Sequence, residues 1–156
     1  MKINNIDAKQ ILQFQRNRYP CFFVDYLSEV IPGEKASGYK LFSCNESYFY
    51  KDIRKSFEVP KTIQTEVLEQ VFLMTFLTLP ECINKKTATI KCDSYFFEGI
   101  SSGERLDIIA KLTRFRRGIA EGIGEGFVDS KLAIRSEFLV SVPDIINCFK
   151  PLCKGI

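Results

Sequence analysis

The chain has 156 residues, of which 46% are hydrophobic and 26% charged, and its net charge is +3. This composition is typical of one globular domain and excludes collagen-like, low-complexity and disordered chains. No apolar run reaches the length of a membrane span, and the net charge is too small to indicate nucleic-acid binding. We therefore expect no membrane span and no nucleic-acid partner.

The sequence contains no histidine. A Ser-His-Asp triad, a Cys-His dyad, a histidine-ligated metal and a histidine general base are therefore all excluded within this chain. No two of its six cysteines have the Cys-x-x-Cys spacing, so we expect no metal site. The polar start over residues 1–10 lacks the apolar stretch of a signal peptide, so we expect a cytoplasmic protein with reduced thiols.

The first elements are a helix and a hairpin. Residues 7–14 predict a short helix with Asp7 as its cap. Residues 22–30 and 36–43 are rich in strand-forming side chains, and the turn residues 31–34 between them indicate a β-hairpin.

Residues 60–79 form the strongest helical pattern in the chain. Pro60 suits the first turn, and Pro80 stops the helix. From Val71 onward the pattern is apolar on nearly every side, which indicates a buried helix rather than an amphipathic one.

The chain after Pro80 has a β pattern. Gly122, Gly124 and Gly126 share one strand face, where glycines permit another element to pack closely. Residues 116–118 suggest a bulge or bend. The expected strands, three or four in number, cover residues 87–97, 106–115, 119–128 and 132–142, with 119–128 continuing after the bulge or bend. A tail over 143–156 follows.

A lone apolar helix needs a surface to cover it. A curved antiparallel sheet wrapped around the long central helix satisfies this need, which predicts the α+β class. We expect a single domain over residues 1–156, with its core at about 11–142 and a C-terminal tail.

Four segments, in matching order and spacing, resemble the β-hydroxyacyl-acyl-carrier-protein dehydratases over almost the whole chain. They are residues 18–25 (R-Y-P-C-F-F-V-D), similar to R-Y-P-F-L-L-V-D; residues 31–36 (I-P-G-E-K-A); residues 60–70, with Glu66, Leu68 and Gln70 in register with P-G-V-L-x-x-E-A-L-A-Q; and residues 102–106 (S-G-E-R-L), similar to P-G-D-x-L.

This resemblance implies a hot-dog fold and a homodimer, with further assembly into a hexamer in many relatives. It also implies an acyl thioester ligand that enters a tunnel at the dimer interface. The acyl chain is carried on the phosphopantetheine of an acyl carrier protein or of coenzyme A, and no other cofactor is implied.

The resemblance assigns catalysis to a histidine and to a helix carboxylate. Glu66 retains the carboxylate, whereas Asp52 stands at the histidine position and Lys61 replaces the glycine that begins the oxyanion hole. In the alternative interpretation neither residue is catalytic: Asp52 is an ordinary loop residue, and Glu66 is a solvated residue that complements the helix dipole. The substrate-binding candidates are Lys61, Thr62, Tyr19 and Pro20.

A basic cluster comprises Lys111, Arg114, Arg116 and Arg117, and no acidic residue occurs from Lys111 to Ala120. Together with Lys55 it is a candidate dock for the acidic surface of a carrier protein or for coenzyme A phosphates. An ordinary charged sheet face is the alternative.

These features favour a dehydratase-like protein of fatty-acid or polyketide-like biosynthesis that binds or processes acyl thioesters, with lost or altered dehydratase activity. Two alternatives remain open. One is a hot-dog thioesterase that uses Glu66, and the other is a noncatalytic partner subunit.

Overall fold

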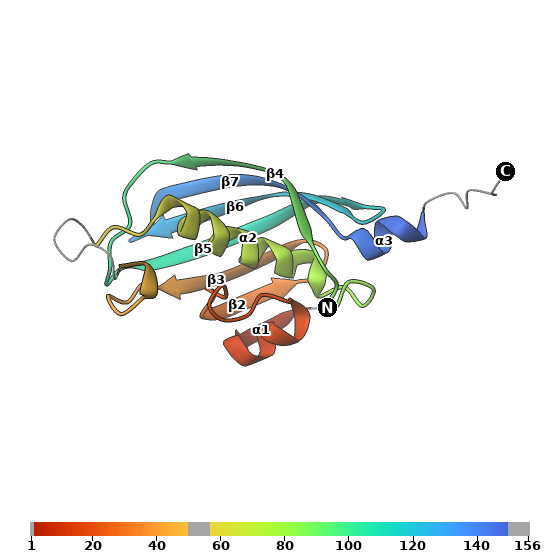
Figure 1. Ribbon diagram of the computed structural model, residues 1–156, viewed down its shortest axis with the longest axis horizontal. Helices are drawn as coiled ribbons and strands as arrows, with labels where there is room; N and C mark the ends of the chain where they lie inside the picture. The colour runs from red at the N-terminus through yellow and green to blue at the C-terminus, as the bar shows by residue number, and fades with distance from the viewer. Residues whose placement is uncertain (1, 50–56, 150–156) are drawn as a thin grey trace.

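The computed structural model describes residues 2–49 and 57–149. Within these residues, seven strands form one antiparallel sheet in the order β1-β2-β3-β5-β6-β7-β4. The long helix α2 lies across one face of the curved sheet (Figure 1). The elements are β1 (Ile3–Asp7), α1 (Ala8–Phe14), β2 (Tyr26–Ile31), β3 (Lys35–Leu41), the 3-10 turn η1 (Ser47–Phe49), α2 (Lys61–Leu77), β4 (Ala88–Phe96), β5 (Arg105–Arg116), β6 (Ile119–Val128), β7 (Lys131–Ser141) and α3 (Pro143–Cys148).

The expected α+β arrangement of a buried helix wrapped by an antiparallel sheet is confirmed. Every residue of α2 from Gln70 to Leu77 is buried. The glycines of β6 allow the helix to lie close to the sheet, because a Cβ placed on Gly122 would lie 2.3 Å from Cε2 of Phe72. The inferred close packing against this glycine face is therefore confirmed.

The N-terminal prediction is correct for α1, which Asp7 caps by accepting a hydrogen bond from the Gln10 backbone. The sequence did not indicate β1, a short edge strand in which only Ile6 is buried. The core therefore extends beyond residue 11 toward the N-terminus. The predicted strand 22–30 begins only at Tyr26, because the Phe23 N–H donates to the Gln70 side chain of α2 rather than to a strand.

The expected bulge or bend at residues 116–118 was wrong. The chain reverses there in a tight hairpin, in which Arg117 and Gly118 have φ values of 51° and 80°. The predicted tail contains α3, which begins at Pro143.

The sheet has two edges, β1 and β4. β4 pairs with β7 on one side only. Large apolar side chains on or beside β4 are exposed, namely Ile90 (55%), Tyr95 (53%) and Phe97 (57%). This edge has the character of an association surface. No helix among the described residues is long and apolar enough to span a membrane.

Candidate functional site

Glu66 lies in the second turn of α2 and is half-buried. Gln70, four residues later on the same helix face, donates from Nε2 to Oε1 of Glu66 at 2.7 Å. Gln70 is fully buried and is itself held in place, because its Nε2 also donates to the Cys21 carbonyl at 2.8 Å and its Oε1 accepts from the Phe23 N–H at 2.9 Å. The Glu66 carboxylate is therefore oriented by the fold, rather than being a freely solvated first-turn glutamate.

A pocket of about 410 Å³ opens beside Glu66, between the N-terminal half of α2 and the inner face of β4. It brings together two of the predicted substrate-binding residues and the predicted carboxylate. Its lining comprises Lys61, Thr62, Thr65 and Glu66 from α2 and Cys92, Ser94 and Phe96 from β4. The β4 residues were not identified from the sequence, because their position depends on the long-range pairing of β4 with β7.

The start of α2 offers backbone donors to this pocket. The Pro60 carbonyl accepts the N–H groups of Ile63 at 2.9 Å and Gln64 at 3.1 Å. For the N–H groups of Lys61 and Thr62, no acceptor is found in the described parts of the chain. Free donors at a helix start stabilise negative charge on a bound oxygen. The Lys61 side chain lies over the Phe96 ring, 5.1 Å from its centroid, and so closes one side of the pocket.

A second carboxyl group, Glu69, lies one turn beyond Glu66 and was not singled out from the sequence. The hydroxyl of Thr89 on β4 donates to it. Burial raises the pKa of Glu69, and the neighbouring charge of Glu66 raises this pKa further, against the opposing effect of the Thr89 hydrogen bond. The spacing of three residues on one helix face was the available signal.

We expect Glu69→Gln to stabilise the protein increasingly as the pH rises. Between the ordinary pKa of 4.5 and the raised pKa, the folded state holds a proton that the unfolded chain has lost. The free energy of unfolding of the wild type therefore falls as the pH rises through this interval, and the variant lacks this loss. Melting temperatures from about pH 4 to about pH 8 measure the effect. The exposed Glu34→Gln serves as control, and a pH-independent difference for Glu69→Gln would contradict the expectation.

Tyr19 and Pro20 lie in the loop between α1 and β2, and both are exposed. They do not line the pocket, but the chain directly after them is attached to α2 through the Cys21 carbonyl and Gln70. Asp52 and Lys55 lie outside the described residues, so their predicted roles stay predictions.

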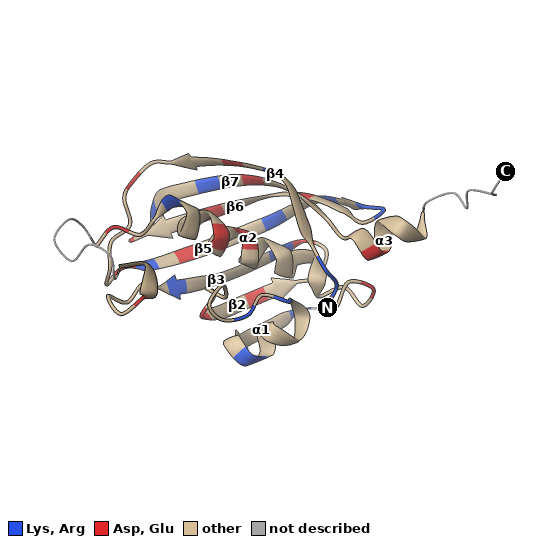
Figure 2. Cartoon of the chain, in the orientation of Figure 1, with Lys and Arg blue, Asp and Glu red and all other residues tan. Residues whose placement is uncertain are grey.

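The basic cluster lies at the β5–β6 hairpin, at the same end of the molecule as α3 (Figures 1 and 2). Arg114 lies 3.7 Å from Glu121, and Arg117 lies near the Phe149 ring. Phe115 stacks on Phe76, about 22 Å along α2 from Lys61 at ~1.5 Å rise per residue. Within one chain, the arginines and Lys61 therefore do not form one continuous surface.

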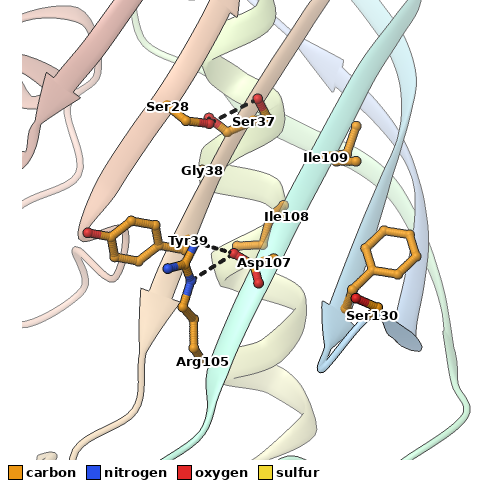
Figure 3. Close-up of a pocket in the computed structure, with 10 residues that line it drawn as sticks. Ser28, Ser37, Gly38, Tyr39, Arg105, Asp107, Ile108, Ile109 and Ser130 are labelled. Atoms are coloured by element: carbon orange, nitrogen blue, oxygen red, sulfur yellow. Dashed lines mark hydrogen bonds and ion pairs between the residues drawn. The ribbon is translucent and has the colours of Figure 1, made fainter.

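Another pocket, of about 360 Å³, lies on the sheet face that points away from α2 (Figure 3). Its charged groups neutralise each other, since Arg105 pairs with Asp107 at 2.6 Å. The Arg105 guanidinium also stacks on the Tyr39 ring at 4.1 Å. No carboxylate is left free there, so the pocket beside Glu66 is the better candidate.

The free cysteines among the described residues include Cys92, which lines the pocket. Burial raises the pKa of the Cys92 thiol, against the opposing effect of the hydrogen bond with Ser94, and the charges of Glu69, Asp93 and Glu66 raise this pKa slightly further. A thiol with a raised pKa is a poor nucleophile. In the described residues, no group of three acidic or cysteine side chains could hold a metal ion.

No family model matches the chain. It is, however, 32% identical over 140 residues to the 3-hydroxyacyl-[acyl-carrier-protein] dehydratase FabZ of Chloroflexus aggregans, a match that covers 89% of this chain and 97% of the relative. The chain belongs to the FabZ family. The pocket beside Glu66 is thus a site in a FabZ-type chain that has no histidine.

Solved structures confirm the hot-dog fold. The dehydratase heterocomplex ApeI:P from Xenorhabdus doucetiae superposes with a TM-score of 0.71 at 10% identity, over 90% of this chain and 97% of that chain. A phenylacetic acid degradation-related protein from Ralstonia eutropha, provisionally named a thioesterase, has a TM-score of 0.55 at 18% identity, over 69% of this chain and 76% of that chain. At these identities the likeness shows the fold alone.

Proposed function

We propose that this FabZ-family chain binds 3-hydroxyacyl thioesters in the pocket beside Glu66 and dehydrates them slowly. The observation that carries the proposal is the Glu66 carboxylate, which Gln70 orients at 2.7 Å beside a pocket of about 410 Å³. The N–H groups of Lys61 and Thr62, for which the described residues contain no acceptor, supply donors for the thioester oxygen.

The proposed reaction uses one carboxyl group twice. Glu66 takes a proton from C2, and the negative charge moves onto the thioester oxygen, which the N–H groups of Lys61 and Thr62 stabilise. The carboxyl group returns its proton to the 3-hydroxyl, the C3–O bond breaks, water leaves, and the C2–C3 double bond forms. With no histidine to share the proton transfers, we expect turnover about 10²–10⁴-fold below that of a relative with two such groups.

The acyl chain in this proposal is carried on the phosphopantetheine of an acyl carrier protein or of coenzyme A, in cytoplasmic fatty-acid or polyketide-like biosynthesis. Arg114, Arg116 and Arg117 dock the acidic carrier. Their clustering supports this role, as does the lack of any acidic group paired with Arg116 or Arg117 in the part of the chain that the structure describes.

We propose that a second copy of the chain pairs with the β4 edge to form a dimer. We propose that three such dimers form a hexamer. We expect a dimer at micromolar concentration, because the unpaired edge and its apolar side chains favour strand pairing between copies. Tyr95→Lys should shift the protein toward monomer, since like charges brought together across paired strands are destabilising. Sedimentation measures the oligomeric state of the wild type and of Tyr95→Lys. Ile109→Lys, on the sheet face away from α2, is the control and should remain dimeric. A wild-type monomer would contradict the dimer.

Incubation with a 3-hydroxyacyl-pantetheine thioester tests the proposed function. Formation of the 2-enoyl product supports slow dehydration. Release of free thiol would instead support the thioesterase alternative, which a single helix carboxylate and the thioesterase-like fold neighbour favour. Binding without either product would support a noncatalytic partner subunit, an arrangement that the dehydratase heterocomplex makes structurally reasonable.

A further inference from the structure

Three hydroxyl groups meet at the wall of the pocket beside Glu66. Thr65 on α2 donates to Ser94 Oγ on β4 at 3.1 Å, and Ser94 Oγ lies 2.8 Å from Ser136 Oγ on β7. Ser136 is fully buried, whereas Ser94 and Thr65 line the pocket. The three groups therefore form a chain that leads from the sheet interior to the ligand space.

The number of hydrogens in this network of three hydroxyl groups determines which group donates to which. Three hydroxyl groups carry three hydrogens, but only two hydrogen bonds join them. Within the described residues, Ser136 Oγ has no side-chain partner except Ser94. If Ser136 did not donate to Ser94, its hydrogen would be buried without an acceptor, which costs about 1–3 kcal/mol.

The buried Ser136 hydrogen therefore determines the direction of these hydrogen bonds. Ser136 and Thr65 both donate to Ser94 Oγ, which accepts two hydrogen bonds and directs its own hydrogen toward Cys92 Sγ. The remaining neighbour of that hydrogen is Cys92 Sγ at 3.5 Å, and sulfur is a weak acceptor. Ser94 is thus a hydrogen-bond donor presented to the pocket.

We propose that the Ser94 hydroxyl donates a hydrogen bond to the 3-hydroxyl oxygen of the bound acyl chain and so selects hydroxylated over unsubstituted chains. This inference rests on the proposed function, because it places the acyl chain in this pocket. Thr65, which orients Ser94, is the direct neighbour of Glu66, and Ser94 and Glu66 line the same pocket of about 410 Å³. An oxygen one carbon beyond C2 is therefore within the space that both side chains line.

The test compares the pantetheine amides of 3-hydroxybutyrate and butyrate, in which nitrogen replaces the thioester sulfur to suppress turnover. Calorimetry of the wild type should show the hydroxylated amide binding about 2–10-fold more tightly, the expected effect of one hydrogen bond. In Ser94→Ala this ratio should fall to about 1, with the affinity for the butyryl amide retained. Ser94→Thr, which keeps the hydroxyl, should preserve the preference.

Ser37→Ala, in the pocket on the far face of the sheet, is the matched control and should leave the ratio unchanged. Thermal unfolding of Ser94→Ala establishes that the variant is folded. A ratio that is the same in wild type and in folded Ser94→Ala would overturn this inference alone. Binding of neither amide to the wild type would overturn the proposed function, and this inference with it.

Discussion

Glu66→Gln is expected to lower turnover of a 3-hydroxyacyl-pantetheine thioester by about 10²–10⁴-fold, because the amide can neither take the C2 proton nor return it. The fold should persist, since the Oε1 of a glutamine at this position still accepts the hydrogen bond that Gln70 donates at 2.7 Å. Ligand affinity should also change little, because the amide fills the same space. Single-turnover kinetics with saturating protein measure the chemical step.

Two comparisons make this result specific. Glu34→Gln changes an exposed glutamate in the turn between β2 and β3 and should leave turnover unaffected. Melting temperatures of both variants separate loss of chemistry from loss of folding. An active protein in which Glu66→Gln retains wild-type turnover would refute Glu66 as the catalytic residue, while the fold would stand.

Gly122→Ala is expected to cause the largest loss of stability among single alanine substitutions in β6. Its Cβ would lie 2.3 Å from the Lys111 carbonyl oxygen on β5 and 2.3 Å from Cε2 of Phe72 on α2. Neither neighbour can move freely, because one is backbone within a sheet and the other is a fully buried ring. We expect a loss of about 3 kcal/mol or more, which corresponds to a drop of roughly 6–12 °C in melting temperature for a chain of this length.

Gly124→Ala is the matched comparison on the same strand face. Its Cβ would lie 3.1 Å from the Phe138 ring and 3.3 Å from Leu68, which are side chains that can shift slightly. We expect a loss of about 1 kcal/mol. Thermal and urea unfolding of the two variants should rank them in this order. Equal melting temperatures would show that α2 does not lie against β6 as closely as described.

The fold was predictable where a local pattern determined it. The apolar run after Gln70 predicted the buried helix, and the period-two glycines predicted a sheet face open to close packing, which the structure shows to be occupied by α2. The tight reversal at Arg117 was missed, because arginine with a positive φ has no clear turn signature in the sequence. β1 was missed because a short, mostly polar edge strand is defined by pairing with β2 rather than by its own pattern.

The candidate site was likewise predictable only where its residues are close together in the sequence. Glu66, Lys61 and Thr62 are close in the chain and on one helix, so the resemblance was enough to bring them together. Ser94 depends on which face of β4 turns toward α2, and this follows from the register of β4 with β7, such as Ser94 opposite Ser136. Such long-range pairing has no local signal. The role of Gln70 in fixing Glu66 depends equally on the distant Cys21 carbonyl.

A crystal structure with the pantetheine amide of a 3-hydroxy acid is the most direct test of the proposed site. We expect C2 of the acyl chain to lie about 3–3.5 Å from the Glu66 carboxylate, the distance needed for proton transfer between well-oriented groups. The amide oxygen should accept from the N–H groups of Lys61 and Thr62. An acyl chain bound in the pocket beside Arg105, or one that leaves Glu66 without contact, would contradict the assignment.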